Sequence, residues 1–301
     1  MKFFKIIFLL IICCVCLGGC FTSDPLEKDN LKDFSPMCSN YGVTRDIIPE
    51  NFIDNFAYTN GYFCYFCYGK SSLLIVAGYK ADISVAKTNR KLPIYSVATN
   101  EKKIAITFDA AWTNQDTNQI IEILEKHNAK ATFFIVGDWA AKFPESVKAF
   151  FNAGHTIANH SDTHKAFSKC SREEIKVEIV NCNKKLQDII GVHVTLIRAP
   201  SGDYTDQSLD VCKELNMTMI QWSCDSLDYT KISTEEIVNR VVKGTTNGSI
   251  LLFHNGVDNT APALDKILTE LSKQGYSFVS VEDLIYKEDY YLDHTGRQHK
   301  K

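Results

Sequence analysis

The stretch Ile104-Ala-Ile-Thr-Phe-Asp-Ala-Ala-Trp112 decides how the rest of the chain is interpreted. It begins as an apolar run that follows the charged pair Lys102-Lys103 and is too short for a helix, so it predicts a buried β-strand. Asp109 stands where this strand ends. In barrels of parallel strands, that end carries the chemistry. The alternative is that Asp109 only caps the following helix, a task that Asp116 or Thr113 could also perform.

Strand-like and helix-like segments alternate along the chain after this stretch. The further strands are expected at Ala131–Val136, Thr156–Ala158, Val194–Ile197, Met219–Trp222, Ser249–Phe253 and Phe278–Val281. Ser171-Arg-Glu-Glu174 and Ser233-Thr-Glu-Glu236 have the pattern of capping boxes, which begin helices. The alternation favours a parallel sheet covered by helices. We therefore expect an α/β fold, an irregular (β/α) barrel of about seven parallel strands with a small N-terminal extension.

The N-terminus has the features of a bacterial lipoprotein signal. Positive charge in residues 1–5 precedes the apolar run Ile6–Leu17, which is too short for a comfortable membrane span. The run ends in Leu17-Gly-Gly-Cys20, which resembles a lipobox, where the signal is cut before a cysteine that carries a diacylglycerol. We expect a signal peptide over residues 1–19. Lipidated Cys20 would then anchor the protein to the outer face of the cell membrane, with an uncleaved anchor as the alternative.

The rest of the chain divides into four further parts. Residues 20–40 are polar and predict a tether, and residues 41–97 form an N-terminal extension of unknown role. Within the extension, Cys64-Tyr-Phe-Cys67 has redox or half-zinc spacing without a second cysteine pair, and we interpret it as structural or incidental. The main domain is expected over residues 98–286, followed by a polar, frayed tail over 287–301. The net charge of −3, with both signs mixed, argues against a nucleic-acid partner.

Almost every predicted strand is followed at once by polar residues. They are Asp109, His160-Ser-Asp-Thr-His164, Arg198, Asp225-Ser-Leu-Asp-Tyr229 and His254-Asn255. Because the carboxyl ends of parallel strands share one rim of a barrel, we expect these side chains to converge. His160 and His164 are four residues apart, so on a helical turn both imidazoles would face the same way and could bind one divalent ion.

These polar clusters form five motifs, in the same order as those of a known family. The arrangement resembles the polysaccharide deacetylase, or NodB-homology, domain (carbohydrate esterase family 4). The resemblance covers about Leu92 to Leu284, and Thr107-Phe-Asp-Ala-Ala-Trp112 is most similar to a branch from spore-forming Gram-positive bacteria. It implies a metal-dependent hydrolase that removes N-acetyl groups from amino sugars. The expected location outside the membrane makes peptidoglycan the nearest polymer of that kind.

The resemblance also implies a role for each matching residue. Asp109 matches the general base, Arg198 the residue that orients the base, His254 the general acid and Asp228 an acid that tunes charged partners. His160 and His164 match two ligands of a divalent metal, first of all zinc, with cobalt, manganese or nickel as alternatives. The side chains expected to line the substrate groove are Trp112, Tyr204, Trp222, Tyr229 and Leu251. For the aromatic residues, packing in the core is the alternative, and for Trp222 it carries equal weight.

The chain departs from the family pattern at two positions. Ala110 stands where the family has a second Asp, which is a metal ligand, and Ser201 replaces a Tyr whose backbone N–H contributes to the oxyanion site. Catalytic zinc normally keeps three protein ligands. We therefore expect a weaker metal site, in which water, a substrate oxygen, Asn114 or Asp162 takes the remaining position.

Three functions stay open on the sequence alone. The first is a peptidoglycan de-N-acetylase, favoured by the matched base and acid. The second is a non-catalytic envelope lipoprotein that binds glycan, which Ala110 supports. The third is a carbohydrate O-acetyl esterase, which would share Asp109 and the metal but need His254 less.

Overall fold

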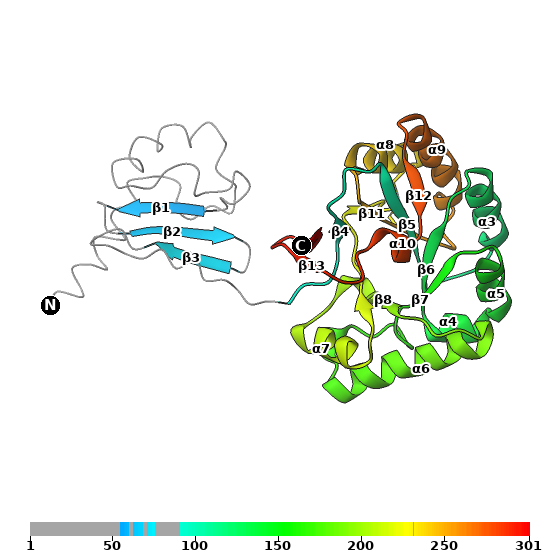
Figure 1. Cartoon of the computed structure of the whole chain (residues 1–301), viewed down its shortest axis with the longest axis horizontal. Helices are drawn as coiled ribbons and strands as arrows, with labels where there is room; N and C mark the ends of the chain where they lie inside the picture. The colour runs from blue at the N-terminus through cyan, green and yellow to red at the C-terminus, as the bar shows by residue number, and fades with distance from the viewer. Residues whose placement is uncertain (1–54, 60–62, 69–70, 76–90, 231) are drawn as a thin grey trace. The chain divides into compact units, whose positions relative to one another are not determined.

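The computed structural model describes residues 55–59, 63–68, 71–75, 91–230 and 232–301 (Figure 1). The chain forms two units, Met1–Asn89 and Arg90–Lys301. The predicted signal peptide, the tether and Cys20 lie outside the described residues. Within the described part, no helix combines the length and apolar character needed to cross a membrane.

The first unit contains a small antiparallel sheet. Its strands pair in the order β1-β2-β3, with bounds β1 (Asn55–Thr59), β2 (Phe63–Tyr68) and β3 (Ser71–Ile75). Cys64 and Cys67 both belong to β2.

The second unit begins and ends differently from our expectation. It starts at Arg90, so the segment before residue 98 contributes β4 (Ser96–Val97) to the main domain. The polar tail forms β13 (Tyr290–Leu292) and β14 (Arg297–Lys300), which pair with each other, and β14 also pairs with β4. Gln298 is fully buried and hydrogen-bonds both the N–H and the carbonyl of Tyr286. These bonds explain why the tail is not frayed.

The main domain is built on one parallel sheet. Its strands are β5 (Lys103–Ala110), β6 (Ala131–Ile135), β7 (Thr156–Asn159), β8 (Leu196–Ile197), β9 (Thr218–Met219), β10 (Cys224–Asp225), β11 (Ile250–His254) and β12 (Ser277–Val279). The order is β10-β11-β5-β6-β7-β8-β9, with β12 also beside β5, and all these pairs are parallel. The sheet curls into an irregular barrel whose edge strands are β9 and β10. The predicted fold class is confirmed.

Helices surround this sheet (Figure 1). They are α3 (Thr117–Lys126), α4 (Gly137–Lys142), α5 (Pro144–Asn152), α6 (Arg172–Ile190), α7 (Asp206–Glu214), α8 (Thr234–Gly244), α9 (Thr260–Lys273) and α10 (Val281–Leu284). Both predicted capping boxes are present, at the first residues of α6 and α8. Gly191 ends α6 in a left-handed conformation with φ of 75°, which glycine adopts without strain. The short helices α4 and α10 were not predicted.

Alternation along β5 separates two buried faces. Ile104, Ile106, Phe108 and Ala110 belong to the larger core, which packs against the helices. Ala105 belongs to a second core inside the barrel, with residues from β6, β7, β8 and β11. Because successive side chains of a strand point to opposite faces, Thr107 and Asp109 lie on the inner face with Ala105. The strand therefore delivers Asp109 to the inside of the barrel at its carboxyl end.

Candidate active site

The polar residues predicted at the strand ends come together at one mouth of the barrel. Asp109 near the end of β5 is the direct partner of His254 at the end of β11 in the register of these two strands. His160 follows β7 immediately, and Arg198 follows β8. Asp228 lies three residues beyond β10, in the next loop. The parallel sheet thus gathers at its carboxyl end residues that are far apart in sequence.

Asp109 is an ionised carboxylate held by a buried guanidinium. Arg198 Nη1 donates to Asp109 Oδ1 at 2.6 Å, and both side chains are buried. Arg198 Nη2 donates to Thr107 Oγ1 at 2.9 Å and to the carbonyl oxygen of Gln221 at 3.1 Å. Burial acts to raise the pKa of Asp109, but nearby positive charge, above all that of Arg198, lowers it below its ordinary value. Asp109 therefore carries a negative charge at neutral pH.

Asp109 does not cap the helix that follows it. The N-cap position of α3 is Asp116, as the alternative interpretation allowed, but the Asp116 side chain makes no capping hydrogen bond. Its Oδ2 accepts instead from the backbone N–H of Gly256 at 2.7 Å. Asp109 is thus free of a structural task at the helix, and Asp116 has a different one.

His160 presents an unprotonated nitrogen to Asp109. Its Nδ1 lies 2.9 Å from the carbonyl oxygen of Arg198, which can only accept, so Nδ1 carries the proton. Its Nε2 lies 3.4 Å from Asp109 Oδ2. Burial lowers the pKa of His160 to about 4, against the attraction of Asp109, so the ring is neutral at physiological pH. Two lone-pair donors then face each other, an arrangement that a cation between or beside them would stabilise.

His160 and His164 lie on an irregular loop, and our expectation of a helical turn was wrong. Ser161 and His164 have positive φ of 65° and 60°. The Ser161 N–H donates to Asn159 Oδ1 at 2.7 Å, and the His164 N–H donates to Ser161 Oγ at 3.0 Å. The two rings nevertheless lie close, with centroids 5.0 Å apart. Local hydrogen bonds, not helical periodicity, bring the imidazoles together.

Glu178 of α6 holds this loop through hydrogen bonds, and the sequence did not predict this role. Its Oε2 accepts from the backbone N–H groups of Asp162 and Thr163 at 3.0 and 2.7 Å. Its Oε1 accepts from Thr163 Oγ1 at 2.7 Å, and the side chain is buried. A conformation with two positive φ angles persists only when its surroundings enforce it, and Glu178 supplies that enforcement.

His160 and His164 offer two nitrogen ligands that suit a divalent ion, and no third side chain in the described part of the chain joins them. Among the described residues, no group of three or more His, Cys, Asp or Glu side chains could hold a metal. Ala110 is fully buried with Phe108 in the core that faces the helices. The two replacements we considered are engaged elsewhere: Asp162 pairs with Lys185 at 2.7 Å, and Asn114 Nδ2 donates to Ser146 Oγ at 3.0 Å.

Asp228 holds His254 beside Asp109 and favours its protonated form. Its Nδ1 lies 2.7 Å from Asp228 Oδ1, and its backbone N–H donates to Asp228 Oδ2 at 2.8 Å. Thr260 Oγ1 also donates to Asp228 Oδ2, at 2.7 Å. Burial acts to lower the pKa of His254, but the hydrogen bond and charge of Asp228 raise it overall. Because Nδ1 is bound to Asp228, the proton available for transfer is on Nε2.

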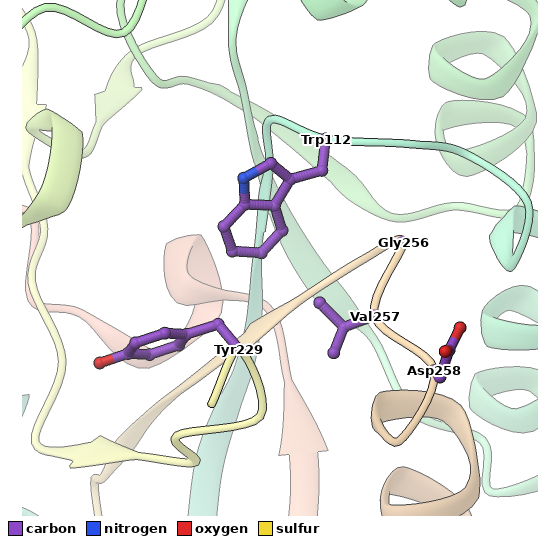
Figure 2. A pocket seen from close by; sticks show the side chains of 5 residues that line it. All are labelled: Trp112, Tyr229, Gly256, Val257 and Asp258. Atoms are coloured by element: carbon purple, nitrogen blue, oxygen red, sulfur yellow. The ribbon is translucent and has the colours of Figure 1, made fainter. Parts of the chain in front are cut away.

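Two exposed aromatic rings flank His254 and border a pocket. The ring centroids of Trp112 and Tyr229 lie 4.9 and 5.0 Å from that of His254. Figure 2 shows both rings at the pocket of about 290 Å³, which Gly256, Val257 and Asp258 also line. Trp112 is 47% exposed and Tyr229 is 48% exposed, which is unusual for large rings with only a structural role.

The structure does not bring the other three predicted groove residues to this pocket. Tyr204 is half-buried and packs against the core that faces the helices. Trp222 is half-buried, with its ring 5.4 Å from the Arg198 guanidinium, so it packs against a residue that orients the base. Leu251 is fully buried in the outer core, and Leu252 is the neighbour that shares the face of His254.

An inward-facing carboxylate with its guanidinium, a histidine pair and an opposing acid at the mouth of a (β/α) barrel define a hydrolase of the carbohydrate esterase type. The model of the polysaccharide deacetylase family matches residues 96–220. A peptidoglycan-N-acetylglucosamine deacetylase of Bacillus cereus is 37% identical over 196 residues, which cover 64% of this chain and 92% of that protein. The chain therefore belongs to the polysaccharide deacetylase family, a family of hydrolases.

Three other similar proteins differ in how much of their length this chain covers and in their described activity. The peptidoglycan-N-acetylglucosamine deacetylase PgdA of Listeria monocytogenes is 34% identical over 210 residues, which cover 68% of this chain but only 44% of PgdA. The peptidoglycan-N-acetylmuramic acid deacetylase PdaA of Bacillus subtilis is 31% identical, with 64% of this chain and 74% of PdaA covered. The solved structure of BA3943 from Bacillus anthracis, described as a pseudoenzyme of carbohydrate esterase family 4, has a TM-score of 0.63 and 29% identity, covering 70% of this chain and 73% of BA3943.

Proposed function

We propose that this protein removes N-acetyl groups from amino sugars of peptidoglycan. The observation that carries the proposal is the placement of an ionised base and a histidine paired with a carboxylate on neighbouring strands. Asp109 is held by Arg198, and His254 is held by Asp228. A protein that only binds glycan needs neither the base nor the acid in a fixed protonation state.

The residues of the mouth match the proton transfers of acetamide hydrolysis. Water adds to the acetyl carbonyl while Asp109 takes one of its protons, and the carbonyl oxygen becomes an oxyanion. His254 Nε2 then gives its proton to the sugar nitrogen, the C–N bond breaks, and acetate and a free amine leave. Each positioned acid or base contributes roughly 10²- to 10⁴-fold to the rate. The lowered pKa of Asp109 keeps the base ionised at neutral pH, and the raised pKa of His254 favours the protonated form that an acid needs.

The proposal includes a divalent ion, with zinc as the first candidate. His160 and His164 would hold it, and an ion bound there would polarise the acetyl carbonyl and lower the pKa of a bound water. With only two protein ligands, binding should be weaker than at a closed three-ligand site. Support comes from the unprotonated Nε2 of His160, which faces the Asp109 carboxylate at 3.4 Å.

Peptidoglycan is proposed as the substrate on two grounds. Three of the named relatives are described as deacetylases of N-acetylglucosamine or N-acetylmuramic acid in peptidoglycan. The exposed rings of Trp112 and Tyr229 offer flat apolar faces beside His254, and sugar rings stack on such faces. Both rings lie beside His254, the residue that would protonate the leaving amine.

One assay tests the activity. Acetate and free amines are measured from purified peptidoglycan with the protein as isolated, after chelation, and after Zn²⁺ is added back. We expect release that the chelator abolishes and Zn²⁺ restores. Asp109→Asn should release no acetate and should keep a cooperative unfolding transition. An Asp109→Asn protein that deacetylates at the unchanged rate would remove Asp109 from the mechanism.

A glycan-binding protein without activity is the second candidate. It is favoured by the missing third ligand at Ala110 and by the similarity to BA3943. This candidate predicts no acetate release at any metal concentration, together with retention of the protein on insoluble peptidoglycan. Retention should then weaken on Trp112→Ala, because the pocket would be the binding surface. Acetate release from the metal-loaded protein would exclude this candidate.

We further propose that the protein is a lipoprotein on the outer face of the bacterial cell membrane. Support comes from the charged start, the apolar run and Leu17-Gly-Gly-Cys20. The proposal predicts that Cys20→Ala leaves an unlipidated precursor. Mass spectrometry of the N-terminal peptide should find a diacylglyceryl group on Cys20, and an N-terminus with a free thiol at that position would refute lipidation.

A further inference from the structure

Two loops at the mouth are joined by hydrogen bonds, each between a side chain and a main-chain group. One follows β5 and contains Trp112 and Thr113, and the other follows β11 and contains Asn255 and Gly256. The Gly256 N–H donates to Asp116 Oδ2 at 2.7 Å, and Asn255 Nδ2 donates to the carbonyl oxygen of Thr113 at 2.9 Å. Thr113 Oγ1 adds a longer hydrogen bond to the carbonyl oxygen of Gly256 at 3.4 Å. The indole Nε1 of Trp139 donates to that same Thr113 carbonyl at 3.2 Å.

The contact leaves no space for a side chain at Gly256. Its φ is +77°, and a Cβ atom there would lie 2.5 Å from Thr113 Oγ1 and 2.9 Å from the backbone nitrogen and oxygen of Thr113. Separations this short do not occur between real atoms of these kinds, and the left-handed backbone also favours glycine. The two loops therefore approach as closely as main chains can, and Asp116 satisfies the N–H donor at the point of contact.

Asp116 occupies this position at an energetic disadvantage. It is 7% exposed, and no cation among the described residues pairs with it. Its Oδ1 is buried without a hydrogen-bond partner in the described part of the chain. Burial, with smaller repulsion from Asp228 and Asp258, raises its pKa. A buried carboxyl group with one oxygen that makes no hydrogen bond is costly, so general stability does not explain Asp116 at this position.

The fastened loops carry the two rings that meet at the mouth. Trp112 immediately precedes Thr113, and His254 immediately precedes Asn255, and the two rings lie 4.9 Å apart. Trp112, Gly256 and Asp258 all line the pocket in Figure 2. Parting of the loops would therefore separate the indole from the imidazole and open the pocket along one wall.

We propose that Asp116 is a positioning residue that locks the loop after β11 onto the loop after β5, and so holds Trp112 against His254. Asp116 touches neither the acid nor the base of the mouth, and it acts through the Gly256 N–H. Its effect on catalysis rests on the proposed deacetylase function, whereas its effect on the contact between Trp112 and His254 does not.

Two variants separate the hydrogen bond from mere filling of space. Asp116→Asn keeps an oxygen that can accept from the Gly256 N–H. Asp116→Leu has a similar volume, removes the acceptor and removes the buried carboxyl, so the fold should survive. Glu122→Ala, which removes an exposed acid from the same helix, is the matched control. Should Asp116→Leu not fold, Asp116→Ser takes its place, because its shorter side chain cannot reach the same donor without movement of the loop.

The contact itself can be followed by fluorescence. A protonated imidazole beside an indole quenches indole emission, so Trp112 reports the charge and nearness of His254. The chain has three Trp residues, and the difference between each protein and its Trp112→Phe version isolates the signal. The charged groups that face His254 are Asp228, Asp109 and Asp225, so His254→Gln in the same background confirms the origin of the pH-dependent step.

The expected result is a pH-dependent step in Trp112 emission in the unmodified protein, in Asp116→Asn and in Glu122→Ala. In Asp116→Leu the step should shrink to less than about half, and kcat/KM should fall about tenfold to a hundredfold, as for a displaced catalytic group. A folded Asp116→Leu protein that keeps the full step overturns the proposal, whatever its activity. If no version releases acetate, the proposed function fails while the fluorescence still decides the role of Asp116.

Discussion

Replacement of Arg198 by Met tests the electrostatic basis of the mouth. The guanidinium is fully buried, pairs with Asp109 at 2.6 Å and lies 4.1 Å above the ring of Phe134. Methionine fills much of the same volume without charge. Removal of one partner of a buried ion pair leaves the other charge uncompensated and costs about 3–5 kcal/mol. We expect Arg198→Met to lower the free energy of unfolding by that amount and to abolish deacetylation.

A double-mutant cycle separates this pair from general packing. Asp109→Asn alone should also destabilise, because Arg198 then lacks its anion. The combination Asp109→Asn with Arg198→Met should recover at least about 2 kcal/mol relative to the sum of the single changes. Urea unfolding of the four proteins, followed by circular dichroism, measures the coupling. Additivity within about 0.5 kcal/mol would show that the two side chains do not stabilise each other.

The pH dependence of the free energy of unfolding provides a second test of the Asp109–Arg198 pair. With Arg198 present, the pKa of Asp109 lies below its ordinary value, so the folded state binds this proton less readily than the unfolded chain. The pair therefore adds stability above about pH 4, and that stability is lost as the pH falls through the lowered pKa. In Arg198→Met the strongest positive charge is gone, so burial, opposed only by His160 and His254, should raise the pKa of Asp109. Its contribution should then change sign, so that acidification stabilises the variant at this site.

Three further outcomes follow from the same geometry. His254→Ala should slow cleavage of acetamido sugars at least tenfold more than cleavage of O-acetyl sugars, because an amine leaves only after protonation. Equal losses in parallel assays would exclude His254 as the proton donor. Glu178→Leu should weaken Co²⁺ or Zn²⁺ binding in calorimetric titrations about tenfold or more. Glu178→Gln, which still accepts from the loop, and the exposed control Glu173→Gln should bind as before. Unchanged affinity in Glu178→Leu would refute the role of Glu178. Burial lowers the pKa of His155 to about 4, below its value in the unfolded chain. The contribution of neutral His155 to the free energy of unfolding, up to about 3 kcal/mol, should be complete above about pH 6.5 and lost as the pH falls through 4. A His155→Phe protein with the same pH slope in urea unfolding would contradict this.

The parts of the fold that follow from local pattern were predictable. Both capping boxes form as expected, because Ser and Glu three residues apart satisfy the first N–H groups of a helix without help from the rest of the chain. The long strand around Phe108 was predicted by its apolar run, and its predicted ends differ from the observed ones by at most two residues. The strand β8 lies within the strand predicted at Val194–Ile197. The strand β10 was not predicted, because two residues are too few for any period to show, and its position is set by its pairing with β11.

The site was predictable at the strand ends and unpredictable where distant hydrogen bonds decide. Asp109, Arg198 and His254 stand directly at strand ends, where the topology alone brings them together. Glu178 has no such signal, because an acid in a helix ordinarily faces solvent. The same holds for Thr107, which looks like part of an apolar strand but donates to the carbonyl oxygen of Leu251 and accepts from Arg198. Only the folded chain shows these partners.

Loss of the third metal ligand does not remove the attraction of the mouth for a cation. Ala110 lies on the outer face of β5, so its methyl group stabilises the core and leaves the inner face unchanged. On that face, the ionised Asp109 and the neutral Nε2 of His160 still lie 3.4 Å apart with no proton between them. Each would gain from a positive charge, and His164 lies beside them. Affinity should therefore depend more on the charge of Asp109 than it does where three protein ligands close the site. Asp109→Asn should accordingly weaken Zn²⁺ binding in calorimetry as well as stop catalysis, and an unchanged affinity would show that the two imidazoles alone hold the ion.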